Sequence, residues 1–410
     1  MEAIVERCAG IDIGQATVAV TVLAGPAHQK PRKTTRTFRT VTRELLELRE
    51  WLLAERVTHV GMESTGIYWK PVYALLEDAF EMIVGNATRI KNVPGRKTDV
   101  KDSEWIAELV RHGLIAKSFV PPPPIRELRD LVRYRRKLVE SRVAERNRLL
   151  KLLETANIKL SSVASNVFGV SGMLMLQALI AGDQTPEAMA APAKGVLKRK
   201  RGQLTLALDG RMTAHHRLLL TLQLTRLQHV DHDVAQMDTY IEACLMPYAA
   251  ACAKLTKIPG VNRIAAAGIV AEIGVDMGVF HGDAHLAAWA GVCPGNNESA
   301  GKRGPTPARK GNLHLKTLLV EVAQSAVRVK GTYFQDKFWR LQRRRGRNRA
   351  IMAIAHKILI RVYHVLATDG EYRELGDTYL DGLDRRRVAH GLVRRLERLG
   401  YAVRLDQPAA

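Results

Sequence analysis

The first 111 residues alternate between short apolar runs and stretches with helical spacing, and this order limits the fold more than any other feature of the chain. Short runs rich in apolar and β-branched residues predict strands, and apolar residues every three or four positions predict amphipathic helices. The short connection at residues 14–16 predicts a hairpin between the first two strands, and Thr42 is the expected N-cap of the first helix. The expected strands are residues 9–14, 17–23, 35–40, 57–63 and 80–84, and the expected helices are residues 42–55, 66–78 and 98–111.

The RNase H-like fold has the same order of elements: three strands, a helix, a strand, a helix, a strand and a helix. Its first three strands are antiparallel. In that fold, acids in the middle of strand one, at the end of strand four and in the last helix meet at one edge of the sheet. An acid inside an apolar strand is costly unless it is ionised beside a partner, so the acid of the first strand is the most informative residue. These positions hold Asp12, Glu63, Asp99 and Asp102.

Asp99 and Asp102 stand three residues apart at the expected start of a helix, so their side chains share one face. Two neighbouring carboxylates repel each other unless a cation lies between them, and a divalent metal with oxygen ligands is the usual solution. The alternative is that the pair only favours the helix N-terminus, where the helix dipole stabilises acids in any case.

The charge of the chain predicts a polyanionic partner. The 410 residues carry 63 Lys and Arg against 41 Asp and Glu, for a formal net charge of +22, and nucleic acid is the first candidate. A membrane surface is the second, but the longest apolar stretches, such as residues 173–181, are too short to span a bilayer. The four cysteines show no C-x-x-C spacing, which disfavours a zinc site or a disulfide framework. The first residues do not read as a signal peptide, so we expect a cytoplasmic protein.

The four prolines at 121–124 predict a stiff linker and a domain boundary. Beyond it, apolar residues recur at helical spacing to about residue 160, and again from about residue 208 to residue 245. Two long, near-heptad helices predict an antiparallel coiled-coil arm or an oligomer contact, and an ordinary helical bundle is the alternative. Between them lies a basic tip, formed by Lys198, Arg199, Lys200 and Arg201.

The last third of the chain begins with a segment that resembles a helix-hairpin-helix. Residues 255–262 lead into an Ala-rich helix at 264–272, whose N-terminus could take up a phosphate. Asn262 stands where a second glycine is usual, and Asn tolerates the left-handed conformation moderately well.

Residues 291–304 read as a loop that presents Ser299 among small residues. A serine that attacks a phosphodiester needs an exposed hydroxyl, small neighbours and nearby cations. The alternative is a turn or capping serine. The cations that follow it are Lys302, Arg303, Arg309 and Lys310.

Two further arginine runs lie near the C-terminus. The run at 340–349 precedes an apolar helix at 350–366 and reads as phosphate-contacting, with Arg343, Arg344, Arg345 and Arg347 as candidates. The run at 385–387 fits better with a solvated charge run.

With these segments in view, the chain resembles the DEDD transposases of the insertion-sequence 110 family (the 110/116/902 group). The similarity runs from about residue 8 to about residue 365, and the combination of the acidic tetrad with the serine-bearing block is highly specific. The matching segments are residues 10–14, 62–66, 97–99, 102–103, 258–261, 289–291 and 294–303.

The resemblance implies a RuvC-like domain at 1–120, a linker and coiled-coil arm at 121–250, and a mainly helical transposase domain at 251–410. It implies Mg2+-dependent recombination of donor and target DNA, guided by a structured noncoding RNA of the element, in a dimer or tetramer. It also makes Ser299 the nucleophile and the four acids the metal ligands. The alternatives are a hydrolytic Holliday-junction-resolvase-like nuclease and a non-catalytic nucleic-acid-binding protein.

Overall fold

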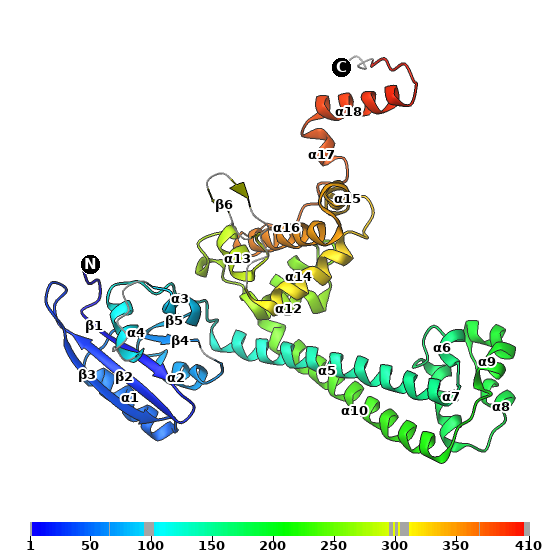
Figure 1. Cartoon of the computed structure of the whole chain (residues 1–410), viewed down its shortest axis with the longest axis horizontal. Helices are drawn as coiled ribbons and strands as arrows, with labels where there is room; N and C mark the ends of the chain where they lie inside the picture. The colour runs from blue at the N-terminus through cyan, green and yellow to red at the C-terminus, as the bar shows by residue number, and fades with distance from the viewer. Residues whose placement is uncertain are drawn as a thin grey trace. The chain divides into compact units, whose positions relative to one another are not determined.

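The computed structural model describes residues 2–64, 66–93, 102–294, 298–299, 302–303, 311–368 and 370–405, and of residues 88, 89, 298, 299, 302 and 303 only the backbone. The chain divides into two compact units, Met1–Val120 and Pro121–Ala410 (Figure 1). The further division of the second unit at residue 250 stays a prediction.

The first unit is a mixed sheet with helices on both faces. Its five strands have the order β3-β2-β1-β4-β5. β1 pairs antiparallel with β2, and β2 with β3, whereas β1–β4 and β4–β5 are parallel. The expected antiparallel first three strands are therefore confirmed. The elements are β1 (Arg7–Ile13), β2 (Thr17–Ala24), β3 (Arg32–Arg39), α1 (Thr42–Ala54), β4 (His59–Glu63), α2 (Trp69–Leu76), β5 (Glu81–Gly85), α3 (Ala87–Lys91) and α4 (Asp102–Arg111).

Alternate residues of β1 face two different cores. Ala9 and Ile11 belong to a core that also contains residues of α1 and α2. Cys8, on the opposite face, belongs to a smaller core with residues of α4. Because side chains at i and i+2 share a face of a strand, Gly10 and Asp12 lie on the α4 side of the sheet.

α4 lies directly on β1 because Gly10 has no side chain. A Cβ at Gly10 would stand 2.2 Å from the Ser103 carbonyl oxygen and 2.2 Å from the Ala107 nitrogen. The Ser103 hydroxyl, which is buried, is 2.9 Å from that of Thr21 on β2, and Thr21 is in turn 3.0 Å from Thr35 on β3. This row of hydroxyls ties the first turn of α4 to the sheet.

The second unit is helical apart from a short two-stranded hairpin, within the part of the chain that the structure describes. Its helices are α5 (Pro123–Thr155), α6 (Leu160–Val163), α7 (Val170–Ala181), α8 (Pro186–Ala190), η1 (Gly195–Lys200), α9 (Arg201–Leu208), α10 (Ala214–Leu245), η2 (Met246–Tyr248), α11 (Ala249–Leu255), α12 (Arg263–Ile273), η3 (Met277–Val279), α13 (Asp283–Ala290), α14 (Leu313–Ala326), α15 (Tyr333–Arg345), α16 (Arg347–Ala367), α17 (Tyr379–Gly382) and α18 (Arg385–Arg398). The hairpin strands are β6 (Glu298–Ser299) and β7 (Lys302–Arg303).

α5 and α10 pack against each other as a long antiparallel pair (Figure 1). Ion pairs connect the two helices, and the residue numbers fall along α10 as they rise along α5. The pairs are Arg135 with Asp238, Arg142 with Asp231, and Glu145 with Arg226. At the far end, α6–α9 form a small helical cap, whose hydrophobic core also includes leucines of α5 and α10. The helix pair agrees with the prediction of two long helices, and its coiled-coil character stays a prediction.

α16 is the central helix of the group formed by α13, α14, α15 and α16. Its buried residues include Ile354, Ile358 and Val362, and it packs against α13, α14 and α15. By length and composition alone it could cross a membrane. The apolar helix predicted at 350–366 is therefore confirmed, although its Arg, Lys and His residues kept it from being counted among the longest apolar stretches. Its packing inside the helical unit accounts for its apolar character.

Several boundaries differ from the sequence predictions. Val41, not Thr42, is the N-cap of α1, and its side chain makes no capping bond. α10 begins at Ala214 rather than near residue 208, since Thr213 forms a capping box with His216. α5 begins at Pro123, with Pro122 as its N-cap. The last two prolines of the linker are thus the first residues of a helix, where proline needs no hydrogen-bonding partner.

Candidate functional site

Asp12 and Glu63 lie at the carboxyl ends of two neighbouring parallel strands. Ile11 of β1 stands opposite Met62 of β4, so Asp12 and Glu63 follow one residue later on each strand. Asp12 is exposed to solvent near the end of β1. It is therefore not the buried mid-strand acid that the sequence analysis expected, and the sheet edge supplies its hydration.

Asp102 reaches the same edge from α4. It is the first residue of that helix, directly before Ser103, which is held over Gly10 and hydrogen-bonded to Thr21. Partial desolvation raises the pKa of Asp12, and the negative charges of Asp102 and Glu63 raise it further. Asp102 and Glu63 therefore both act on Asp12 electrostatically at one edge of the sheet.

Lys91, the last residue of α3, opposes this accumulation of negative charge. Its positive charge lowers the pKa of Asp12, as does a backbone hydrogen bond from Ile13. The sequence analysis missed Lys91, since neither spacing nor composition places the end of α3 beside strand β1.

The fourth predicted acid, Asp99, lies outside the residues that the structure describes. Within the described ranges, no three His, Cys, Asp or Glu side chains form a group that could hold a metal ion. The donor chemistry of the acidic edge nevertheless fits a hard divalent cation, which prefers several carboxylate oxygens.

The predicted serine loop contains a short antiparallel hairpin. Ser299 in β6 pairs with Lys302 in β7, and Glu298 pairs with Arg303. The backbone therefore brings Ser299 level with a lysine, beside the turn of the hairpin. The side chains of these residues, and both Arg309 and Lys310, lie outside what the structure describes.

Two glycines close the base of this loop. A Cβ at Gly311 would stand 2.4 Å from the Gly291 nitrogen and 2.6 Å from the Trp289 carbonyl oxygen. The next residue, Asn312, donates its backbone N–H to that same carbonyl at 3.2 Å. The end of α13 and the start of α14 are thus held together at the point where the loop leaves and returns.

A buried carboxylate, that of Glu272, is hydrogen-bonded to Asn312 at the base of the loop. Glu272, near the end of α12, accepts two 2.8 Å hydrogen bonds from Arg133 and one of 2.6 Å from Asn312. Arg129 donates to the backbone carbonyls of Ala271 and Glu272 and pairs with the Glu272 carboxylate. Burial by itself raises the pKa of Glu272, but these partners outweigh it and hold the pKa below its usual range. The sequence analysis missed this cluster, since nothing along the chain links α5, α12 and α14.

The predicted phosphate-contacting residues differ in their surroundings. All four basic residues of the tip are exposed, and Lys200 and Arg201 also donate to backbone carbonyls of the helical cap, to Val163 and Ala191 respectively. The arginines at the junction of α15 and α16 are all exposed, namely Arg343, Arg344, Arg345 and Arg347.

The hairpin between α11 and α12 departs from expectation at Asn262. Gly260 adopts the left-handed conformation (φ 85°), but Asn262 has an extended backbone (φ −92°). Its side chain caps α12 by accepting from the Ala265 N–H at 2.8 Å. Asn262 therefore occupies one of the donors that a phosphate at this helix end would use.

Comparison with known proteins places these segments in one family. A family profile for transposases of the DEDD, IS110 type matches residues 9–158, and one described as "Transposase IS116/IS110/IS902 family" matches residues 252–338. The chain is also 25% identical over 287 residues to the transposase for insertion sequence element IS1111A of Coxiella burnetii (strain RSA 493 / Nine Mile phase I). That similarity covers 68% of this chain and 70% of the relative.

The chain belongs to the IS110/IS116/IS902 family of transposases. It is thus an insertion-sequence transposase by family, and such enzymes act on DNA. The first profile contains the acidic edge, and the second contains the serine hairpin and Glu272. The helical cap beyond residue 158 and helices α16–α18 lie outside both profiles.

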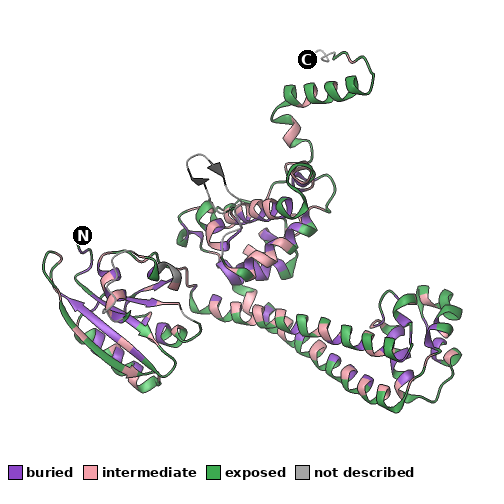
Figure 2. Cartoon of the chain, viewed as in Figure 1, coloured by how far each residue is buried: buried purple, intermediate pink, exposed green. Residues whose placement is uncertain are grey.

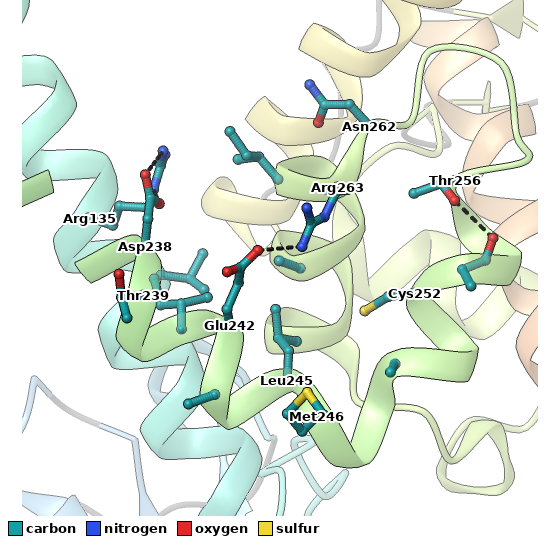
Figure 3. Close-up of a pocket in the computed structure, with 17 residues that line it drawn as sticks. Arg135, Asp238, Thr239, Glu242, Leu245, Met246, Cys252, Thr256, Asn262 and Arg263 are labelled. Atoms are coloured by element: carbon teal, nitrogen blue, oxygen red, sulfur yellow. Dashed lines mark hydrogen bonds and ion pairs between the residues drawn. The ribbon is translucent and has the colours of Figure 1, made fainter. Parts of the chain in front are cut away.

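A large cavity of this transposase lies among α5, α10, α11 and α12 (Figure 3). Its volume is about 1030 Å³, and its lining includes Leu245, Met246 and Cys252. Two ion pairs stand at its wall, Arg135 with Asp238 and Arg263 with Glu242 (Figure 3). Among the predicted metal ligands that the structure describes, Asp12, Glu63 and Asp102 do not line it.

Proposed function

We propose that this transposase cuts and rejoins DNA with an acidic tetrad that holds Mg2+ and with Ser299 as the nucleophile. The observation that carries the proposal is the meeting of Asp12, Glu63 and Asp102 at one edge of the sheet. Asp99, three residues before Asp102, would complete the set. The fold of the first unit, with antiparallel β1–β3 and the acids at that edge, supports a RuvC-like assignment.

The four carboxylates would hold the Mg2+ ion, which supplies charge stabilisation for the oxygens of the reacting phosphate. Ser299 Oγ would attack the phosphorus, forming an O–P bond while the bond to the leaving deoxyribose oxygen breaks. The leaving oxygen takes up a proton and departs as a hydroxyl group. Because the phosphoserine link preserves a phosphodiester, the reverse attack by another strand end rejoins DNA without an added energy source.

Lys302 and Arg303 would assist this attack through the hairpin. The backbone pairs Ser299 with Lys302, and directly opposite residues of an antiparallel pair are neighbours. Positive charge there stabilises the phosphate oxygens as negative charge builds on them. Arg309 and Lys310 add further positive charge on the returning part of the loop.

The remaining partners follow from the family and the charge. We propose that a structured noncoding RNA of the element guides the enzyme and that the chain works as a dimer or tetramer in the cytoplasm, with α5 and α10 as a coiled-coil arm. The exposed basic residues of the cap and of the α15–α16 junction would contact phosphates. Sequencing the RNA that copurifies with the protein tests the guide, and light scattering of the purified protein tests the oligomer.

The decisive experiment incubates protein, copurified RNA and end-labelled DNA with Mg2+ and resolves the products on a denaturing gel. We expect wild type to form a denaturant-resistant protein–DNA adduct and Ser299→Ala to form none. Ser325→Ala, at an exposed serine of α14, is the matched control and should behave as wild type. Cleavage without an adduct would instead establish the hydrolytic resolvase-like reaction. Binding without cleavage under any metal condition would leave only a nucleic-acid-binding protein.

A further inference from the structure

Helix α18 carries an excess of positive charge that the rest of the protein does not neutralise. Its fourteen residues contain one acid, Glu397. Its six arginines are all exposed, and within residues 2–405, so far as these are described, none of them pairs with a carboxylate. They are Arg385, Arg386, Arg387, Arg394, Arg395 and Arg398.

The nearby Arg340 shows the contrast. It belongs to the same helical unit and is held by two carboxylates, Asp336 at 2.8 Å and Asp381 at 2.7 Å. Asp381 lies in α17, which contacts both α15 and α18. Asp336 and Asp381 therefore neutralise Arg340, and the arginines of α18 are left to solvent.

The placement of the first three of these arginines opposes the stability of the helix itself. Arg385, Arg386 and Arg387 fill its first turn, which contains no acid, although the positive end of the helix dipole favours acids there. Arg394 and Arg398 are spaced i and i+4, so they repel each other on one face. An isolated helix of this length is marginal in water. The Arg387 N–H donates to the Asp384 carboxylate at 3.1 Å, and Arg395 and Arg398 in the last turn suit the negative end of the helix dipole. Residues that break local rules in this way are expected where function requires them.

The helix nevertheless has two distinct faces. Arg387, Arg394 and Arg398 follow one another at i, i+7 and i+11 on one side. Val388, Leu392 and Leu396 follow at i, i+4 and i+8 on the other. No residue of α18 is buried, as the green colour of the helix in Figure 2 shows. The arginine stripe extends over roughly 16 Å of helix, a length over which one DNA strand carries about five phosphates.

We propose that the arginine face of α18 binds the phosphodiester backbone of a nucleic acid. Charge complementarity selects this occupant: three arginines in a row meet a regular row of anions, and phosphates near the first turn would also interact favourably with the helix dipole. α18 contains no Trp, Tyr or Phe, the residues that commonly anchor a basic amphipathic helix in a bilayer interface. The site lies outside both family profiles, and the proposal goes beyond the interpretation of residues 385–387 as a solvated charge run.

The test measures binding of the full-length protein to labelled duplex DNA and to a labelled RNA hairpin over a series of NaCl concentrations. Mg2+ is left out, so the result does not depend on the cleavage chemistry proposed above. The variant carries Arg387→Gln, Arg394→Gln and Arg398→Gln and should fold normally, because none of these side chains is buried. We expect the slope of log affinity against log salt to become shallower by about 2–3 units for the nucleic acid that α18 contacts. The DNA and RNA measurements identify which one it is.

The matched control removes three arginines that already have carboxylate partners. Arg32, Arg39 and Arg43 pair with Glu55, Glu44 and Glu47 and are exposed. Their replacement by Gln changes the net charge equally and should leave both slopes nearly unchanged. An equal loss in both triple variants, or an unchanged slope in the α18 variant with both nucleic acids, would overturn the proposal.

Hydrogen exchange gives an independent readout on the wild type. Backbone amides of residues 388–399 should gain protection when the preferred nucleic acid is added, because bound phosphates relieve the repulsion within the helix. Protection that appears with phosphatidylserine vesicles and not with either nucleic acid would assign the helix to a membrane surface and refute the proposal.

Discussion

Replacing Glu272 with Gln tests whether one buried carboxylate fixes the base of the serine loop. The Glu272 side chain is 4% exposed and its partner Arg129 is 15% exposed. Breaking such a buried pair by removing one charge commonly costs about 3–5 kcal/mol. Arg129 keeps its hydrogen bonds to two backbone carbonyls, and Arg133, at 32% exposed, can still reach water. We therefore expect Glu272→Gln to lower the free energy of opening α12 by about 3 kcal/mol.

Because the chain has two compact units, the assay should report locally rather than through a single melting temperature. Hydrogen exchange of the α12 amides, residues 263–273, gives the free energy of opening that helix. The matched control is Asp238→Asn, which removes the partner of Arg135 on α10. Asp238 is 48% exposed, so its loss should cost no more than about 1 kcal/mol.

The stabilisation that Glu272 provides should depend on pH. The folded pKa of Glu272 lies below its unfolded value near 4.5, so its stabilisation is fully present above that pH and is lost as the pH falls through the folded pKa. The difference between wild type and Glu272→Gln should therefore be constant at neutral pH and shrink below about pH 4.5. Equal opening free energies for the two proteins at neutral pH would show that the cluster does not stabilise α12.

Three further predictions concern the acidic edge and the loop. Gly10→Ala should push α4 away from β1, since the new Cβ would meet the backbone of Ser103 at 2.2 Å. We expect the free energy of unfolding of the first unit, measured in urea, to fall by more than about 2 kcal/mol. An unchanged urea midpoint would contradict the packing. Gly311→Ala should open the loop base against Gly291 and slow adduct formation by about tenfold to a hundredfold, whereas a wild-type rate would show that the loop tolerates the shift. Asp102→Asn should keep the circular dichroism spectrum but abolish Mg2+-dependent cleavage, because a neutral amide is a poor ligand for a hard cation. Retained cleavage would show that Asp102 is not one of the metal ligands.

The sequence by itself determined the order of elements in the first unit and the identity of the family. Strands and helices there obey clear periodicities, because each packs one face on a shared core. The regularity also located Asp12, Glu63 and Asp102 on elements that meet at one sheet edge. The position of Ser299 in a glycine-rich loop was equally readable, whereas its pairing with Lys302 in a short hairpin was not.

The tertiary structure decided what depends on contacts between distant segments. Gly10 reads as an ordinary small residue until α4 is seen to lie on it at van der Waals distance. Lys91 and Glu272 carry no local signal, because their roles come from charges brought close by folding rather than by spacing along the chain. The arginines of α18 differ from exposed arginines such as Arg32, Arg39 and Arg43 in lacking carboxylate partners, and sequence composition cannot reveal partners. Local periodicity predicts elements because it reflects a single core face, whereas electrostatic roles arise from three-dimensional proximity.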